Sequence, residues 1–248
     1  MKKYDAVIFD LFDTILDFNF NHLPLVELKG FRSRTTSVEV YEEFKKVYPQ
    51  IEFSEFYDPF IKSYHEFQDL KLIDFKEYPT RERFILMLKM LNIGPVDQDS
   101  PFINKMVVAH MKALASCVEY PTSNKLTLEG LFDKGYTLGI ISNFDYSPTA
   151  HELIDKFNLR PLFKEIVISE EVGWRKPKSI IFEAALDKLK IDGAKSLFIG
   201  DNYSADVVGS KALGMKSVWI NRRNEPDNDL DPKPDYIIKK LSEIRDFL

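Results

Sequence analysis

The most constraining feature of this chain is a short apolar run that ends in a polar residue and recurs along the sequence. The runs are rich in residues that favour β-strands, and each is short enough to be one buried strand. They span residues 6–9 before Asp10, 138–141 before Ser142, 166–168 before Ser169, and 196–200 before Asp201. Near-continuous apolar strands of this kind are typical of a parallel sheet that is covered on both faces.

Further apolar runs at 217–220 and 236–238 extend the predicted sheet, and helical patterns at 179–189 and 205–213 lie between strands. Gly214 follows the second helical pattern as a stop. Strands that alternate with helices predict an α/β fold, a Rossmann-like parallel sheet flanked by helices. In such sheets the functional edge is at the carboxyl ends of the strands, where all the polar residues above would lie.

Residues 17–118 have a different pattern, helical and rich in aromatic residues. Aromatic side chains recur there at the spacing of one helix face, which predicts a helix with a buried stripe. They are Phe53, Phe56, Tyr57, Phe60, Tyr64 and Phe67, with a shorter stripe at Tyr41, Phe44 and Tyr48. We therefore expect an α/β core of residues 1–16 and 119–248 and an inserted helical domain of residues 17–118. Residues 226–234, rich in Asp, Asn and Pro, predict a surface loop.

Charge and composition limit the partners of the chain. A formal charge of −5 and the lack of a dense Lys/Arg cluster argue against a nucleic-acid surface. The one cysteine, Cys117, cannot form an internal disulfide and fits a reducing compartment. Asp5, Asp10 and Asp13 interrupt the apolar stretch that a secretory signal needs, and no run is long enough to span a membrane. We expect a cytoplasmic protein with no membrane partner; monomer and dimer both stay open.

Four segments carry residues suited to chemistry, and they occur in a fixed order. They are residues 9–16 (FDLFDTIL), 140–143 (IISN), 173–177 (GWRKP) and 200–206 (GDNYSAD). An aspartate after a strand, taken alone, is often only a turn or cap residue. The four together, each at a predicted strand end or helix start, resemble the haloacid dehalogenase superfamily. The resemblance covers residues 5–16 and about 124–240, with the helical insert where that family places a C1-type cap domain.

The resemblance implies an aspartyl-phosphate mechanism with Asp10 as the nucleophile. A Mg²⁺ ion would be held by Asp10, Asp201 and the backbone carbonyl of Phe12, because this hard cation prefers oxygen ligands. Lys176 would offset charge on the nucleophile and the phosphoryl group. The remaining site candidates are the phosphate-binding residues Thr14, Ser142 and Asn143, with Lys176, and the catalytic residue Asp206, which would orient Lys176 or a metal-bound water.

One residue departs from the pattern of the family's phosphatases. These carry a second aspartate two residues after the nucleophile, which protonates the leaving group and then activates water. Here that residue is Phe12, which can do neither. Asp13 follows it, but the backbone should direct its side chain away from that of Asp10, so we interpret it as a turn or hydrogen-bonding residue.

Phe12 leaves three functions open. The leading one is a weak Mg²⁺-dependent phosphatase of a small phosphorylated or otherwise anionic metabolite, favouring good leaving groups. The second is a metal-free 2-haloacid dehalogenase, whose family also has an aromatic residue at this place; the presence of Asp201 argues against it. The third is a non-catalytic relative that binds a phosphorylated ligand or a protein. Phosphonate-cleaving relatives also lack the second aspartate, but depend on a cap lysine that nothing in this sequence marks.

Overall fold

The computed structural model describes residues 3–28 and 30–248. The chain forms two compact units, one of residues up to Phe18 together with Glu119–Leu248, and one of Asn19–Val118. The first unit is thus made from two separate parts of the chain, and the second is inserted between them. Within the described ranges, no helix combines the length and apolar character needed to cross a membrane.

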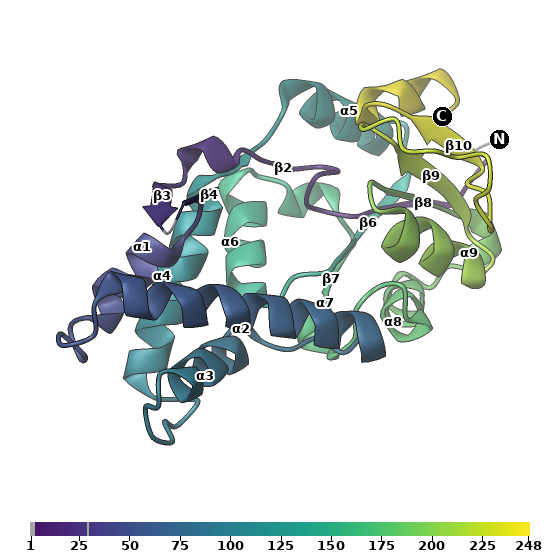
Figure 1. Ribbon diagram of the computed structural model, residues 1–248. Coiled ribbons are helices and arrows are strands. Elements are labelled where there is room, and N and C mark those ends of the chain that lie inside the picture. The colour runs from purple at the N-terminus through teal and green to yellow at the C-terminus, as the bar shows by residue number, and fades with distance from the viewer. Residues whose placement is uncertain (1–2, 29) are drawn as a thin grey trace. The chain divides into compact units, whose positions relative to one another are not determined.

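The first unit is built around a six-stranded sheet in the order β10-β9-β8-β1-β6-β7 (Figure 1). Every neighbouring pair is parallel. The strands are β1 (Ala6–Phe9), β6 (Thr137–Ser142), β7 (Glu165–Ile168), β8 (Ser196–Gly200), β9 (Lys216–Ile220) and β10 (Tyr236–Ile238). This confirms the predicted α/β fold.

The order of the strands makes β1 the switch point of the sheet. From β1 the sheet grows through β6 and β7 on one side, and through β8, β9 and β10 on the other. The carboxyl ends of β1, β6 and β8 are therefore neighbours, which is where a parallel sheet of this kind leaves a binding crevice.

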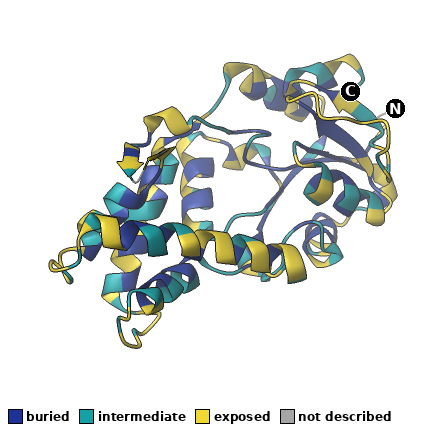
Figure 2. Ribbon diagram, viewed as in Figure 1, coloured by how far each residue is buried: buried dark blue, intermediate teal, exposed yellow. Residues whose placement is uncertain are grey.

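Helices flank this sheet, and its strands are largely buried (Figure 2). Ile181, Phe182 and Ala185 of α8 pack with Ile8 of β1 and Phe198 of β8 in one apolar core. The helices of this unit are α5 (Thr122–Asp133), α6 (Ser147–Lys156), α7 (Ser169–Val172), α8 (Ser179–Leu189) and α9 (Gly209–Ala212), with short 3₁₀ turns at Arg160–Leu162, Gly193–Lys195 and Leu241–Asp246.

The predicted helix at 205–213 differs in its first half, which is a π-helix over Tyr203–Val208 that precedes α9. π-turns occur mostly as single turns within α-helices, so the apolar pattern of a longer segment does not reveal one. π-turns occur often at functional sites, and this one carries Asp206. The predicted loop at 226–234 is free of regular helices and strands.

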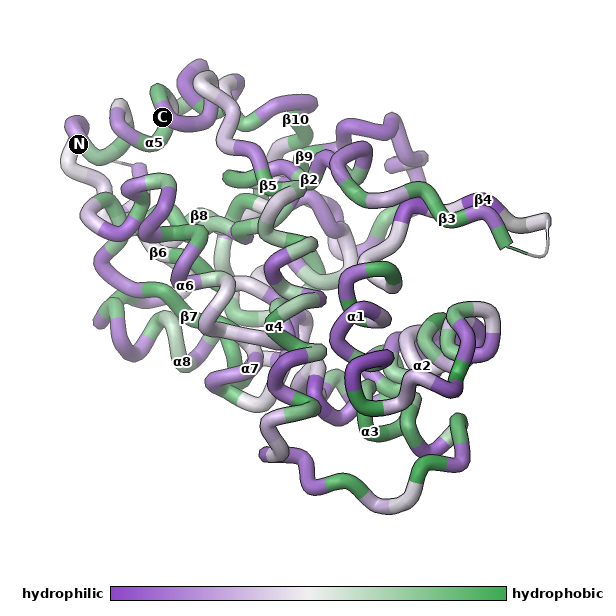
Figure 3. The backbone as a smooth tube through the Cα atoms, turned by 90° about the vertical axis from the view of Figure 1, so that its left-hand side faces the viewer, coloured by the Kyte–Doolittle hydropathy of each residue, from purple (hydrophilic) through white to green (hydrophobic). Residues whose placement is uncertain are grey.

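The second unit is mainly helical, and hydrophobic and hydrophilic residues alternate along its helices (Figure 3). Its elements are a 3₁₀ turn at Phe20–His22, β3 (Leu25–Leu28), β4 (Phe31–Arg34), α1 (Ser37–Phe44), α2 (Phe53–Asp74), α3 (Thr80–Met90) and α4 (Pro101–Ser116). Two short strands, β2 (Asp17–Phe18) and β5 (Val118–Glu119), pair where the chain passes from one unit to the other.

The aromatic stripe of α2 forms the interior of this unit. Phe56 and Phe60 are almost fully buried, and Phe56 packs on Phe44 of α1 with ring centroids 5.0 Å apart. Tyr64 departs from the prediction, because it is exposed to solvent. The antiparallel pair β3 and β4 was also not predicted, since short strands with alternating polar residues give a weak pattern.

Candidate active site

Asp10 stands directly after β1, at the switch point of the sheet. Its backbone N–H donates to the carbonyl of Ile199 in β8 (2.9 Å), so the parallel ladder continues through this residue. Its side chain is almost entirely shielded from solvent. The end of the buried strand thus holds a carboxylate in a fixed place inside the protein.

Lys176, in the third motif, contacts a residue of each of the other three motifs. Its Nζ lies 2.6 Å from Asp10 Oδ1 and 2.8 Å from Asp206 Oδ1, and it donates to the carbonyl of Ile141 in β6 (2.8 Å). The side chain of Lys176 is 1% exposed, so water hardly competes for these contacts. Two of the three donors of this ammonium group form hydrogen bonds, to Asp10 and to Ile141, and the group forms an ion pair with Asp206.

Asp206 is held from both sides by the fold. Its Oδ1 pairs with Lys176, and its Oδ2 accepts from the backbone N–H of Asn202 (2.9 Å). The carboxylate fits only because residue 200 is glycine: a Cβ at Gly200 would lie 2.2 Å from Asp206 Oδ2. Gly200 was not among the predicted site residues, although its place beside Asp201 in the fourth motif was the available sign.

Three carboxylates converge at this edge of the sheet. One oxygen from each of Asp10, Asp201 and Asp206 lies within 4.8 Å of the other two. Carboxylate oxygens are the ligands that Mg²⁺ prefers, so the donor set fits this cation. Lys176 pairs with Asp10 Oδ1 and Asp206 Oδ1, and the N–H of Asn202 donates to Asp206 Oδ2, so within the described ranges Asp201 is the acid that carries none of these contacts.

The pKa values reflect the crowding of these acids. Burial is the largest influence on Asp10 and raises its pKa to about 6, although the charge of Lys176 lowers it. Burial also raises the pKa of Asp201, to about 8, and the charges of Asp10 and Asp206 add to the rise. Burial disfavours the charge of Lys176, but the two carboxylates on it outweigh this and raise its pKa. A cation between the acids would relieve their repulsion.

Two hydroxyl groups of the predicted phosphate-binding set are buried without a partner. Ser142 ends β6 and Thr14 lies in the loop after β1, and both residues are 0% exposed. Among the residues that the structure describes, neither hydroxyl has a hydrogen-bond partner. Buried polar groups are normally satisfied, so these two are suited to donate to a ligand.

Asn143 makes contacts that its predicted role does not include. Its side-chain Nδ2 donates to the carbonyl of Lys176 (3.0 Å), and its Oδ1 accepts from the backbone N–H of the same residue (2.8 Å). Both polar atoms of this amide therefore hold the backbone that carries Lys176. The geometry favours a positioning role for the Asn143 side chain over direct contact with phosphate.

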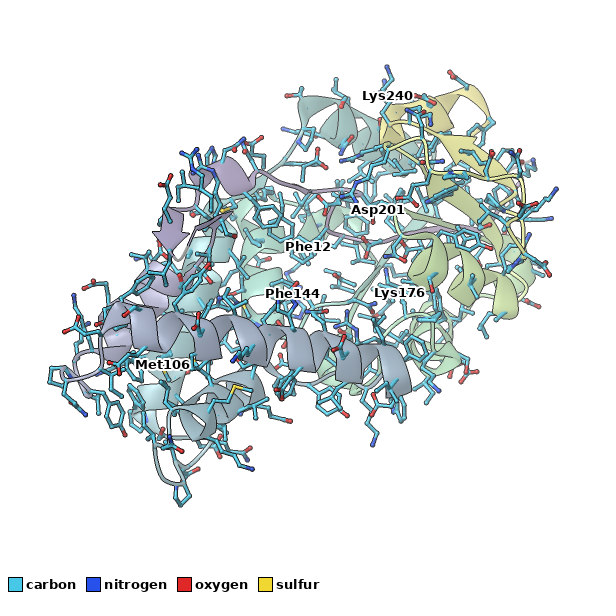
Figure 4. The ribbon with its side chains drawn as sticks, viewed as in Figure 1. Phe12, Met106, Phe144, Lys176, Asp201 and Lys240 are labelled. Atoms are coloured by element: carbon cyan, nitrogen blue, oxygen red, sulfur yellow. The ribbon has the colours of Figure 1, made fainter. Side chains whose placement is uncertain are left out.

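Phe12 belongs to a cluster of three aromatic rings. Its ring is stacked on Phe18 with centroids 4.9 Å apart, and is tilted against Phe144 at 4.7 Å. Phe12 and Phe144 come from the loops after β1 and β6 (Figure 4). Asp13 takes a left-handed backbone conformation (φ 56°), and its Oδ1 accepts from the backbone N–H of Phe18 (3.3 Å). Its carboxylate thus helps to close the turn.

Comparison with known proteins identifies the family. The pattern of the family described as "Haloacid dehalogenase-like hydrolase" matches residues 7–220. This chain is a haloacid dehalogenase-like hydrolase. The match includes the predicted site residues of all four motifs, from Asp10 to Asp206, and the inserted unit.

Individual relatives of this haloacid dehalogenase-like hydrolase cover three quarters or all of its length. It is 27% identical to a glyceraldehyde 3-phosphate phosphatase of Pyrococcus furiosus, over 100% of this chain and 94% of the relative. A protein of the same name from Methanopyrus kandleri is 30% identical over 75% of this chain and 78% of its own. The solved 2-haloacid dehalogenase from Pseudomonas syringae pv. Tomato DC3000 shares the fold, with a TM-score of 0.71 at 21% identity, over 98% of this chain and 97% of that one.

Proposed function

We propose that this haloacid dehalogenase-like hydrolase is a Mg²⁺-dependent phosphatase that cleaves a small phosphorylated metabolite through an aspartyl-phosphate on Asp10. The observation that carries the proposal is the buried ammonium of Lys176 between Asp10 and Asp206, beside the carboxylate of Asp201. A fixed carboxylate at the end of β1 can act as a nucleophile, and the positive charge of Lys176 would offset the negative charge of the carboxylate and the phosphoryl group. The relatives named glyceraldehyde 3-phosphate phosphatase support a small phosphorylated substrate.

Asp10, Asp201 and the backbone carbonyl of Phe12 would hold the cation. A bound Mg²⁺ would supply positive charge between the carboxylate of Asp10 and the anionic phosphoryl group. Asp206 would not be a ligand in this scheme, because it forms an ion pair with Lys176 and its Oδ2 accepts the N–H of Asn202. Its role would be to orient Lys176.

Four residues would act on the phosphoryl group, directly or through another residue. Lys176 keeps Asp10 in place and offsets negative charge in the transition state, since its Nζ is 2.6 Å from the carboxylate. Ser142 and Thr14 would donate their buried hydroxyls to phosphoryl oxygens. Asn143 would act through the backbone of Lys176, as a positioning residue.

Phe12 would set the preference for leaving groups. It has no proton to give, and the carboxylate of Asp13 is occupied by the N–H of Phe18. General acid–base assistance is worth about 10²–10⁴-fold in rate, so alkyl phosphates should react slowly. Acyl and aryl phosphates should react faster, because their leaving groups depart without a proton.

The test uses p-nitrophenyl phosphate and acetyl phosphate with the purified protein, in Mg²⁺ or in EDTA. Phosphate release should need both Mg²⁺ and Asp10, so Asp10→Asn is the matched control. Release that persists in EDTA or in Asp10→Asn would contradict the mechanism. If neither substrate is cleaved while Mg²⁺ and phosphate still bind, the result would contradict the phosphatase and support a non-catalytic protein that binds a phosphorylated ligand.

A second candidate, hydrolysis of a 2-haloacid by attack of Asp10 on carbon, is favoured by the aromatic cluster around Phe12. Such a reaction needs no metal, and the presence of a further acid, Asp201, whose pKa burial raises to about 8, argues against it. Chloride release from 2-chloropropionate that EDTA does not affect would support it.

A cytoplasmic location remains a prediction from the sequence.

A further inference from the structure

Trp219 reaches from β9 to the loop that carries Asp201. In the parallel pairing of β8 with β9, Trp219 lies beside Gly200, one residue before Asp201. Its indole Nε1–H donates to the backbone carbonyl of Asp201 (2.9 Å). The residue is 1% exposed, so this hydrogen bond is formed away from water. None of the sequence motifs includes Trp219.

The same loop is held at two further points. The ring of Tyr203 meets that of Trp219 edge to face, with centroids 5.7 Å apart, and its hydroxyl donates to the carbonyl of Pro232 (3.1 Å). The N–H of Asn202 donates to Asp206. Residues 201, 202 and 203 are therefore each held by a contact of their own, and the one at Asp201 involves its backbone carbonyl.

We propose that Trp219 is a positioning residue for the cation site, because its indole N–H fixes the backbone of Asp201 and so directs that carboxylate toward Asp10. The proposal rests on the use of Mg²⁺ in the proposed function. The carbonyl that Trp219 holds and the carboxylate that would bind the cation belong to the same residue. Rotation of this peptide unit would therefore move the ligand oxygen.

A phenylalanine at this position would fill most of the same volume, but it has no donor. The carbonyl of Asp201 would then be buried without this partner, which favours a rearranged loop. Groups that orient metal ligands typically change metal affinity about 10–100-fold when they are removed. A tryptophan that only fills space would instead affect folding alone.

The test measures Mg²⁺ binding by isothermal titration calorimetry, independent of turnover. Trp219→Phe should weaken the Mg²⁺ Kd about 10-fold. Trp174→Phe, the same substitution at the only other tryptophan, should leave the Kd within about twofold, and Asp201→Asn should abolish binding. Thermal unfolding in EDTA reports any general loss of stability in each variant.

A second readout does not need the Trp219 variant to fold. In Trp174→Phe the remaining indole is Trp219, and saturating Mg²⁺ should shift its fluorescence, with a midpoint that matches the calorimetric Kd. An unchanged spectrum would overturn the proposal. So would a Trp219→Phe variant that melts earlier in EDTA but keeps the wild-type Kd.

The outcomes separate this proposal from the proposed function. If the wild type binds Mg²⁺ and cleaves p-nitrophenyl phosphate while Trp219→Phe keeps its Kd, only the role of Trp219 is wrong. If the wild type binds no Mg²⁺, the cation site fails and the role of Trp219 fails with it. Phosphatase activity that survives in EDTA would identify this second case independently.

Discussion

At the scale of single residues, the proposed chemistry depends on two side chains in the loop after β1, Asp10 and Phe12. Asp10 is buried and paired with Lys176, which suits a nucleophile. Phe12, two residues later, contributes only an aromatic face that stacks with Phe18 and Phe144. The site would therefore form the covalent intermediate more readily than it protonates a leaving group.

Replacing Phe12 with Asp should restore part of the missing proton transfer. We expect Phe12→Asp to raise kcat on an alkyl phosphate such as glycerol 3-phosphate about 10–100-fold, with a smaller change on p-nitrophenyl phosphate. Phe12→Leu, which is apolar but cannot transfer a proton, is the control. A folded Phe12→Asp protein whose rate on the alkyl phosphate stays the same or falls would count against this role of the position.

Gly200 provides a second prediction at this scale. A methyl group there would lie 2.2 Å from Asp206 Oδ2, so Gly200→Ala should displace the acid that orients Lys176. We expect a loss of about 1–3 kcal/mol in the free energy of unfolding, together with a lower kcat. Gly130→Ala in α5 is the control: nothing lies within 4 Å of its Cβ, and alanine favours helix. Equal stability of the two variants in urea would contradict the prediction.

At the scale of elements, the parallel strands are connected partly by a half-buried charge network at the start of β9 and β10. Asp235, just before β10, accepts from the ammonium groups of Lys211 and Lys216 (2.8 Å each) and from the backbone N–H of Ser217 (3.0 Å). It thereby connects the helical turn of α9 with two neighbouring strands. Burial opposes its charge, but these donors prevail and lower its pKa to about 2.

The lowered pKa predicts how stability depends on pH. A carboxyl group with a lower pKa in the folded chain adds stability above its unfolded pKa, near 3.9, and loses it as the pH falls toward 2. Asp235→Asn should therefore cost on the order of 1–2 kcal/mol at pH 7, and the difference from wild type should shrink at pH 3. Urea unfolding at both pH values tests this; a constant difference would show that the charge of Asp235 is not the cause.

At the scale of the whole molecule, the candidate site and the helical interior belong to different compact units. The acids, the lysine and the hydroxyls of the candidate site all belong to the unit built on the sheet. The helical unit has its own interior, which includes the ion pair of Lys71 with Glu77 (3.0 Å), whose side chains are almost fully buried. We propose that this unit is a C1-type cap that selects the substrate.

The separation predicts that damage to the helical unit leaves the cation site intact. Glu77→Gln removes the anion of a buried pair, and breaking such pairs typically costs about 3–5 kcal/mol. We expect a clear loss of stability in thermal unfolding, with a Mg²⁺ Kd unchanged within about twofold. Glu43→Gln, which removes a more exposed partner of Lys46, is the control for stability. A Kd that weakens with Glu77→Gln would show that the cation site depends on the helical unit.

The sequence by itself determined the strands of the sheet and the polar residues at their ends. A strand buried on both faces must be apolar along its length, so its limits are visible in the sequence, as at Asp10 and Asp201. Residue types that suit one kind of chemistry, in a fixed order, also determined the family. The helical stripe at Phe56 and Phe60 could be predicted for the same reason.

Only the tertiary structure decided which groups meet and which are already occupied. Both polar atoms of the Asn143 side chain form hydrogen bonds with the backbone of Lys176. The carboxylate of Asp206 pairs with Lys176 and accepts the N–H of Asn202. Trp219 holds the carbonyl of Asp201 from a neighbouring strand. These contacts depend on the distances between segments that are remote in sequence, and no local pattern encodes them. Residue types reveal what a side chain can donate or accept; the packed sheet determines where that capacity is used.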